Sequence, residues 1–334
     1  MELSVIIVNW NVSELLDKCI ASISHSFMDR SYEVIVVDNA SRDGSLQMLS
    51  SKYPWVKVIA NESNNGFARA NNQGIEISEG DYILLLNPDT IVKRDTINKL
   101  FGSFLIDPSI GMVGPLIFDE NGKITPACKR KTPNLLNIIA KRFLIEKIIL
   151  LIVNKIQSFQ RIYNKHYYIS ECVECIQGAC MLMKKDALDK VGYFDTTIPM
   201  YLDDNDLCFR FNKKGYKIYY CADAELIHVC AASTEKSGKA KSFDIMTYSA
   251  LDTFFMKHKS VLHLIIHRVI LLFSALLLLI VDLIILPFLF MTRRHYIQDL
   301  LRKHLSTIKY SLSLSRVTPV DSFFCKNNSM PPLK

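Results

Sequence analysis

The sequence predicts an α/β protein with a Rossmann-like, mostly parallel β-sheet, followed by a C-terminal membrane-associated helical segment. Two observations carry this prediction. Apolar, strand-like runs alternate with stretches of helical spacing through the first third of the 334-residue chain, and this alternation is typical of a wound parallel sheet. Near the C-terminus, the 23 residues from Val269 to Met291 contain one charged side chain, Asp282, and one proline, Pro287.

Four strands are expected in the early part of the chain. Each is a strand-like, mostly apolar segment, and near-continuous apolar strands fit burial on both faces of a sheet: Leu3–Val8, Val34–Val37, Val56–Ile59 and Tyr82–Leu86. Helices are expected between them, at residues 12–26, 41–53 and 66–78. In the first of these, apolar residues recur at helical spacing, at Leu15, Leu16, Cys19, Ile20 and Ile23.

The following part of the chain is less regular. Residues 110–130 are expected to form a further strand and loop, and sheet-like segments return at 174–185 and 217–229. Residues 135–163 are basic, strongly apolar and free of glycine and proline, which predicts an amphipathic helical insertion that can lie against a membrane. We therefore expect an α/β domain over 1–258, a hydrophobic membrane-associated helical segment over 259–311, and a loosely ordered tail over 312–334.

The apolar run at 269–291 is long enough to cross a membrane. At about 1.5 Å per residue it matches a hydrocarbon core of about 30 Å. Basic residues flank it, with His267 and Arg268 before it and Arg293, Arg294 and His295 after it. Two arrangements remain open, because the helix either spans the bilayer or bends at Pro287 and returns, and Asp282 is costly at membrane depth.

Composition narrows the class of ligand and the compartment. The formal charge of +7, from 40 basic and 33 acidic residues, is too small an excess to indicate nucleic-acid binding. It suits a phosphate ligand or an anionic membrane surface. The N-terminal sequence MELSVIIVNWN lacks the basic region and cleavage site of a signal peptide. Nine cysteines without framework spacing favour a reducing compartment, so we expect the N-terminal part in the cytoplasm.

Polar side chains follow three of the predicted strands. Asn9, the pair Asp38 and Asn39, and the triplet Asn87-Pro88-Asp89 stand where these strands end, and ligands of open parallel sheets bind beyond that edge. Neither G-x-G-x-x-G after the first strand nor a P-loop motif is present, which leaves a nucleotide site made of carboxylates and amides. There, Asp38 is suited to accept from a pyrimidine N–H or ribose hydroxyls and Asp89 to hold a divalent ion. The alternative is that both are turn residues.

An acidic cluster and a histidine are further candidates. Asp203, Asp204 and Asp206 lie within four positions, and such crowding raises a carboxyl pKa toward the range of a general base. The alternative is a helix N-terminus, where acids meet the positive end of the dipole; both hold if Asp206 pairs with Arg210 while Asp204 faces a pocket. His228 follows a strand and is either a metal or phosphate ligand or a structural residue.

Seven ordered blocks in residues 3–235 resemble the family 2 glycosyltransferases, and most closely their rhamnosyltransferase-like branch, which builds bacterial surface polysaccharides. The blocks are SVIIVNWN, VIVVDNASRDGS, NNGFARANNQGI, LLLNPDT, GACMLMKK, VGYFD and YLDDNDLCFR. The resemblance implies a GT-A fold, a nucleotide-sugar donor, a divalent cation (Mg²⁺ or Mn²⁺) and direct displacement with inversion at the anomeric carbon.

The resemblance also implies roles for single residues. Asp89 matches the metal-binding acid, with Asn87 in place of the first acid of D-x-D, and His228 is a second metal candidate, although Ala231 replaces the glycine that usually follows it. Asp204 matches the catalytic base, and the residue before it is Asp203 rather than glutamate, so both are catalytic candidates. The expected donor-binding residues are Asn9, Asp38, Asn39, Asn65, Gly66, Arg69, Asn71, Asn87, Gly178 and Ala179.

By the same resemblance, the partners are a nucleotide-sugar donor, a lipid-linked saccharide acceptor and a membrane, with no nucleic acid. The protein is expected at the cytoplasmic face of the bacterial inner membrane, anchored near 269–291. Rhamnose from dTDP-rhamnose is the expected sugar, and a UDP-hexose is the alternative. Two other classes compete with this hypothesis. A nucleotidyltransferase normally needs a glycine-rich basic loop where this chain has NWNVSELLDK, and a non-catalytic membrane scaffold would not need its acids.

Overall fold

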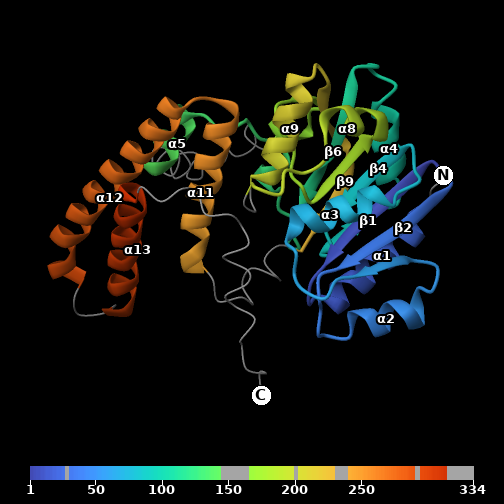
Figure 1. Ribbon diagram of the computed structural model, residues 1–334, viewed down its shortest axis with the longest axis horizontal. Coiled ribbons are helices and arrows are strands. Elements are labelled where there is room, and N and C mark those ends of the chain that lie inside the picture. The colour runs from blue at the N-terminus through green and yellow to red at the C-terminus, as the bar shows by residue number, and fades with distance from the viewer. Residues whose placement is uncertain (27–29, 144–164, 199–201, 230–239, 290–293, 314–334) are drawn as a thin grey trace.

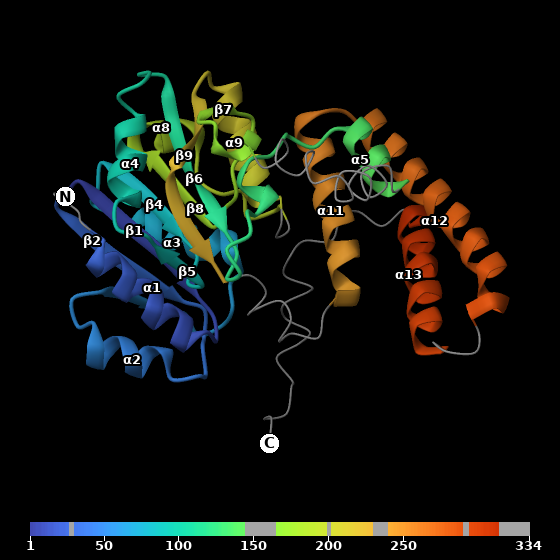
Figure 2. The ribbon, with the colours of Figure 1, turned by 180° about the vertical axis from the view of Figure 1, so that it is seen from behind.

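The computed structural model describes residues 1–26, 30–143, 165–198, 202–229, 240–289 and 294–313. An α/β unit and a helical unit lie side by side (Figures 1 and 2). The helical unit combines α5 (Leu135–Arg142) with the helices that follow residue 239. β1 begins beside the N-terminus, on the side of the sheet away from the helical unit (Figure 1).

The first half of the α/β unit follows the predicted pattern. Strands β1 (Leu3–Asn9), β2 (Tyr32–Asp38), β3 (Lys57–Ala60) and β4 (Tyr82–Leu86) are parallel. Helices α1 (Ser13–His25), α2 (Ser45–Lys52) and α3 (Phe67–Glu76) connect them. The register places Asn9 directly opposite Asp38, so the polar residues that end β1 and β2 meet at one edge of the sheet.

The second half turns the sheet into a mixed one. The strand order is β3-β2-β1-β4-β8-β6-β9-β5, and β7 also pairs with β9. β8 (Cys180–Lys184) runs antiparallel to both β4 and β6 (Ile110–Phe118), whereas β6 and β9 (Lys217–His228) are parallel. Short strands β5 (Thr90–Val92) and β7 (Glu171–Val173) pair antiparallel with β9. The other elements here are α4 (Thr96–Ser103), α8 (Lys185–Val191), α9 (Asp203–Lys213), and the 3₁₀ turns η1 (Pro126–Cys128) and η2 (His166–Tyr168).

The core consists of two apolar layers, one on each face of the sheet. Alternate strand residues point to opposite faces, so Val5 and Ile7 of β1 pack with α1, α2 and α4, while Ile6 packs with α3, α8 and α9. All three side chains are completely buried. This explains why the central strands β1, β2 and β4 are almost continuously apolar, since strands covered on both sides have no polar face. The edge strand β3 differs from the prediction, because three of its four residues are exposed.

Three long helices form most of the helical unit: α11 (Ala240–His258), α12 (Val261–Leu289) and α13 (Arg294–Leu312). α12 and α13 form an antiparallel hairpin, and α11 and α5 pack against α12. α12 begins eight residues before the predicted apolar run, and its segment Val261–Leu283 is long and apolar enough to cross a membrane. α5 begins the insertion predicted at 135–163. The rest of that insertion, Met291 and most of the predicted tail lie outside the described residues.

α11 joins the two units. Its buried residues Ala250, Phe254 and Phe255 form a small apolar cluster with Ile198 and Leu202, which precede α9. Phe209 of α9 meets Phe254 edge to face, with ring centroids 5.4 Å apart. The helical unit is therefore packed onto the helix that carries the acidic cluster.

Candidate active site

The ends of β1 and β2 form a buried polar pair. Asn9 Nδ2 donates to Asp38 Oδ2 at 2.7 Å, and the backbone N–H of Ser41 donates to Asp38 Oδ1 at 2.8 Å. Both side chains of the pair are completely buried. Among the described residues, the Oδ1 atom of Asn9 has no hydrogen-bond partner although it is buried. A buried acceptor without a donor is costly, so an N–H or O–H group of a ligand that reached this atom would remove that cost.

The other early donor-site candidates brace the loop before α3. Asn39 Nδ2 donates to the carbonyl of Gly66 at 3.3 Å, and Asn39 Oδ1 accepts from Asn61 Nδ2 at 2.9 Å. Gly66 has a φ of +79°, a backbone conformation that favours glycine. Asn71 Nδ2 donates within α3, to the carbonyl of Phe67 at 2.9 Å. Asn39 and Asn71 therefore fix the loop that carries Asn65 and the first turn of α3, where Arg69 lies.

The two predicted metal ligands lie side by side. Thr90 of β5 pairs with His228 of β9, and the backbone N–H of Val229 donates to the carbonyl of Asp89 at 2.8 Å. As a result, His228 Nε2 lies 3.1 Å from Asp89 Oδ1, and about a tenth of each side chain is exposed. Within the described residues no cluster of three or more His, Cys, Asp or Glu forms a metal site. A carboxylate and an imidazole fit a cation whose other ligands are water and substrate phosphate.

Asn87 connects this pair to the neighbouring strand. Its backbone N–H donates to the carbonyl of Ala179 at 3.0 Å, and its carbonyl accepts from Thr90 Oγ1 at 2.7 Å. Ala179 and Gly178 immediately precede β8, which pairs with β4. The end of β4 therefore lies against the segment that contains the expected donor-binding residues Gly178 and Ala179.

Asp204 lies at the first turn of α9 and is held in place by four donors. Its Oδ2 accepts from the Arg130 guanidinium and from the backbone N–H of Gly178, the latter at 2.9 Å. Its Oδ1 accepts from the backbone N–H of Asn205 at 2.8 Å and from the Asn205 side chain at 3.2 Å. A Cβ atom at Gly178 would lie 3.3 Å from Asp204 Oδ2. A small residue is therefore needed at 178 for the carboxylate to approach the backbone this closely.

Arg130 is the site residue that the sequence prediction missed. Its Nη2 donates to the carbonyl of Ile176 at 3.0 Å as well as to Asp204. Its backbone forms a two-way bridge with Cys175, with N···O distances of 2.9 and 3.1 Å. The buried Nε atom has no partner among the described residues. One arginine in the basic run CKRK gives no signal by spacing, because its partner is 74 positions away.

Asp203 has a different environment from Asp204. Burial, together with the neighbouring Asp204 carboxylate, raises the pKa of Asp203 to about 7. Asp203 Oδ1 accepts from the backbone N–H of Asp204 at 3.1 Å. In this pair, the Asp204 carboxylate is held by the Arg130 guanidinium. The pKa of Asp203 lies in the range of a general base.

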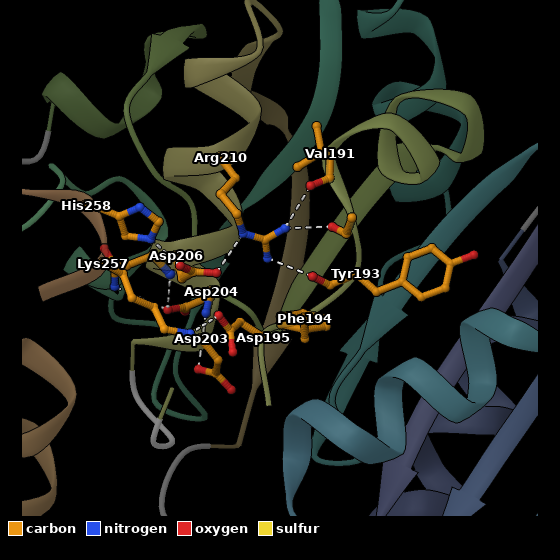
Figure 3. Close-up of polar contacts among 12 residues, drawn as sticks. Val191, Tyr193, Phe194, Asp195, Asp203, Asp204, Asp206, Arg210, Lys257 and His258 are labelled. Atoms are coloured by element: carbon orange, nitrogen blue, oxygen red, sulfur yellow. Dashed lines mark hydrogen bonds and ion pairs between the residues drawn. The ribbon is translucent and has the colours of Figure 1, made fainter. Parts of the chain in front are cut away.

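The third acid of the cluster faces away from this pair. Asp206 Oδ2 accepts from Arg210 Nε at 2.8 Å, and Asp206 Oδ1 lies 2.5 Å from His258 Nε2 at the end of α11 (Figure 3). Arg210 also donates to the carbonyls of residues 191–193. The predicted pairing of Asp206 with Arg210 is therefore confirmed, and Asp206 fastens α9 to its surroundings.

Residues 4–192, more than half of the chain, match the family model described as Glycosyl transferase family 2. The chain belongs to this family. The resemblance predicted from the seven blocks is thereby confirmed, and the protein is a glycosyltransferase.

Relatives of this glycosyltransferase act on several sugars. It is 28% identical over 244 residues to the N-acetylglucosaminyl-diphospho-decaprenol L-rhamnosyltransferase of Mycobacterium tuberculosis (strain CDC 1551 / Oshkosh), covering 70% of this chain and 77% of that protein. It is 24% identical over 233 residues to the low-salt glycan biosynthesis hexosyltransferase Agl10 of Haloferax volcanii, covering 68% and 67%. Among solved structures, the mannosyltransferase PcManGT from Pyrobaculum calidifontis has a TM-score of 0.53 at 17% identity, covering 93% of this chain and 88% of that one. This likeness confirms the predicted fold.

We predict that Arg130→Ala lowers the kcat of the glycosyltransferase because it releases Asp204. A hydrogen bond to a charged group contributes about 1.5–3 kcal/mol, so the expected loss is ~10- to ~100-fold. Arg130→Lys keeps the positive charge but loses the planar guanidinium, whose Nη2 atom donates to both Asp204 and the carbonyl of Ile176. This variant should recover part of the rate. Steady-state kinetics on both variants tests this, with exposed Lys131→Ala as the matched control. Wild-type kcat in Arg130→Ala would show that the ion pair does not serve turnover.

We also predict that Asp203 makes the folded state less stable as pH rises. The unfolded carboxyl loses its proton near pH 3.8, whereas the folded one keeps it to about pH 7. Stability therefore falls between these values and is level above them, because the unfolded state binds fewer protons in that window. Asp203→Asn removes this effect, so its stability relative to wild type should improve by about 2–3 kcal/mol from pH 5 to pH 8. Denaturant unfolding at both pH values measures the difference, and a pH-independent difference contradicts the raised pKa.

Proposed function

We propose that this protein is an inverting rhamnosyltransferase that moves rhamnose from dTDP-rhamnose to a lipid-linked saccharide, at the cytoplasmic face of the bacterial inner membrane, in surface-polysaccharide synthesis. The observation that carries the proposal is that polar and acidic groups from several strands lie at the same edge of the sheet. Asn9 and Asp38 end β1 and β2, Asp89 and His228 follow β4 and end β9, and Gly178 joins β8 to Asp204. We assign the nucleotide to Asn9 and Asp38, the donor diphosphate to Asp89 and His228, and the acceptor hydroxyl to the surroundings of Asp204.

The nucleotide end of the proposed site is preorganised. Asp38 is already oriented by Asn9 and Ser41. The Oδ1 atom of Asn9, which has no partner among the described residues, would accept from a thymine N–H or a ribose hydroxyl. Asn39 and Gly66 hold the adjacent loop in one conformation. Groups fixed before binding lose little freedom when the donor arrives, which favours affinity.

The proposed diphosphate end is the Asp89–His228 pair, which would hold a divalent cation. Such a cation neutralises charge on the departing nucleoside diphosphate. The mannosyltransferase PcManGT was solved with GDP-Man and Mn²⁺, which supports the assignment of a cation and a nucleotide sugar to this chain. The chain itself positions the two ligands by the β5–β9 pairing, so their separation is set by backbone hydrogen bonds rather than by a mobile loop.

The acid pair completes the proposed reaction. A hydroxyl of the acceptor loses its proton to the Asp203–Asp204 pair as its oxygen bonds to the anomeric carbon, and the bond from that carbon to the phosphate oxygen breaks on the opposite face. Because the two carboxylates interact, the proton belongs to the pair rather than to one residue. Arg130 and Gly178 orient the pair, and general-base help of this kind typically gives ~10²- to ~10⁴-fold in rate.

The sugar and acceptor are inferred from the relatives. The mycobacterial relative is named as a rhamnosyltransferase acting on N-acetylglucosaminyl-diphospho-decaprenol, which supports rhamnose and a lipid diphosphate acceptor here. The haloarchaeal relative is named as a hexosyltransferase, so transfer from a UDP-hexose is the second candidate. The match of residues 4–192 to the family 2 glycosyltransferases supports neither the nucleotidyltransferase nor the scaffold alternative.

The proposal is tested by incubating membranes that contain the protein with a panel of nucleotide sugars and an extracted lipid-linked acceptor. We expect nucleoside diphosphate release from dTDP-rhamnose, lost in Asp204→Asn and Asp89→Asn and retained in Asp186→Asn, which changes an exposed carboxylate on α8. Release from a UDP-hexose alone would select the second candidate. No release from any donor by a folded protein would reject the transferase reaction proposed here.

We further predict that the metal preference depends on His228. Imidazole is a poor ligand for Mg²⁺, which prefers oxygen, and a better one for transition metals. His228→Ala should therefore reduce Mn²⁺-supported turnover more than Mg²⁺-supported turnover, whereas Asp89→Asn should reduce both. Titration of each metal against initial rate measures the two effects. Equal losses with both metals in His228→Ala would place the histidine outside the metal shell.

A further inference from the structure

One face of α12 exposes an apolar stripe along most of the helix. Its residues recur every three or four positions, which places them on one side of a helix, and each side chain is 43–62% exposed: Leu262, Ile265, Val269, Phe273, Leu276, Ile280 and Leu283. In both views α12 forms the outer edge of the helical unit (Figures 1 and 2). An exposed apolar surface of this length normally marks an interaction site.

The opposite face of α12 is covered by other helices and contains polar residues. His267, Leu271, Ser274 and Ala275 are fully buried. Ser274 Oγ accepts from Arg142 Nε of α5 at 3.0 Å. One side of α12 therefore packs against other helices, and the opposite side has no partner among the described residues.

Ionisable pairs connect α12 to its neighbours along its length. Asp282, which would be costly in hydrocarbon, lies 2.8 Å from His304 Nε2 of α13. Near the other end of α12, Asp252 of α11 accepts from Arg268 at 3.0 Å and from Tyr310 of α13 at 2.6 Å. α13 therefore runs beside α12 from Asp282 back to Arg268.

α13 cannot accompany α12 through a bilayer. Its sequence contains Arg294, Arg302, Lys303 and Lys309 against one acid, Asp299, and Arg302, Lys303 and Lys309 are exposed. If α12 spanned the membrane in this packing, these charges would enter the hydrocarbon, where charged side chains are strongly disfavoured. Crossing would require the hairpin and its ion pairs to come apart.

We propose that α12 lies in the plane of the membrane, within one leaflet, with its apolar stripe among the acyl chains and α13 beside it at the headgroups. The partner is an anionic lipid surface, because the exposed basic residues of α13 complement it. A second copy of the chain fits less well, since pairing two stripes would bring two basic α13 helices together. This proposal states how the protein lies on the membrane that carries its proposed acceptor. It rests on the proposed function only for the reason why the protein binds a membrane.

Tryptophan depth measurement distinguishes the lying helix from the spanning one. Leu262→Trp, Phe273→Trp and Leu283→Trp are each made in the full chain, bound to phosphatidylcholine–phosphatidylglycerol vesicles, and quenched by lipids brominated at different depths. Positions 262 and 283 are 21 residues apart, or about 32 Å along the helix axis. A lying helix should place all three tryptophans at one depth, about 5–10 Å below the headgroup boundary. The signal of Trp10 and Trp55 in the unmodified chain is subtracted.

Two results would overturn the proposal. Different depths at the three positions, with residue 273 near the bilayer centre, would establish a spanning helix. Absence of quenching at all three positions, with a dimer in sedimentation, would assign the stripe to a second copy.

A second test changes the charge of α13. The double variant Arg302→Gln, Lys303→Gln should bind the anionic vesicles at least ~10-fold more weakly, whereas the control variant Lys131→Gln should bind like the unmodified protein. The depths should be unchanged in Asp89→Asn, so this test and the donor test can fail separately.

Discussion

Burial of carboxylates is the constraint on which the rest of this structure depends, because each buried acid needs a donor or cation beside it. Asp38 is matched by Asn9, Asp204 by Arg130, and Asp206 by Arg210 and His258. In the helical unit, Asp252 is matched by His267, Arg268 and Tyr310. Except for Asp206 and Arg210, which lie four residues apart on α9, these pairs join different segments of the chain, so they determine how strands, loops and helices are brought together.

The first turn of α9 places three neighbouring aspartates in three different environments. Successive helix residues are rotated by about 100°, so neighbouring acids face different surroundings. Asp204 faces Arg130 and Gly178, Asp206 faces Arg210 and α11, and Asp203 is buried beside the negative charge of Asp204. Three identical side chains thereby have different partners and different surroundings.

Local patterns in the sequence were sufficient for much of the fold. The first four strands and the helices between them were predicted because continuous apolar runs and helical spacing are local signals. The reversal of β8 was not foreseen, since strand direction depends on pairing partners rather than on the strand's own residues. The candidate site divides in the same way. Asp38 and Asp89 stand at visible strand ends, whereas the contact of His228 with Asp89 depends on a pairing across 139 positions, and Arg130 gave no local signal at all.

The contact between α11 and α9 has a consequence for how this enzyme can be handled. His258 lies against Asp206, and Lys257 pairs with Asp195 (Figure 3). Phe254 packs on Phe209. A chain shortened before α11 to obtain a soluble fragment would leave Asp206 with one partner in place of two and would uncover the aromatic side of α9. The apolar C-terminal helices are therefore not a detachable part of the protein, because the helix that leads into them packs against the acidic cluster of α9.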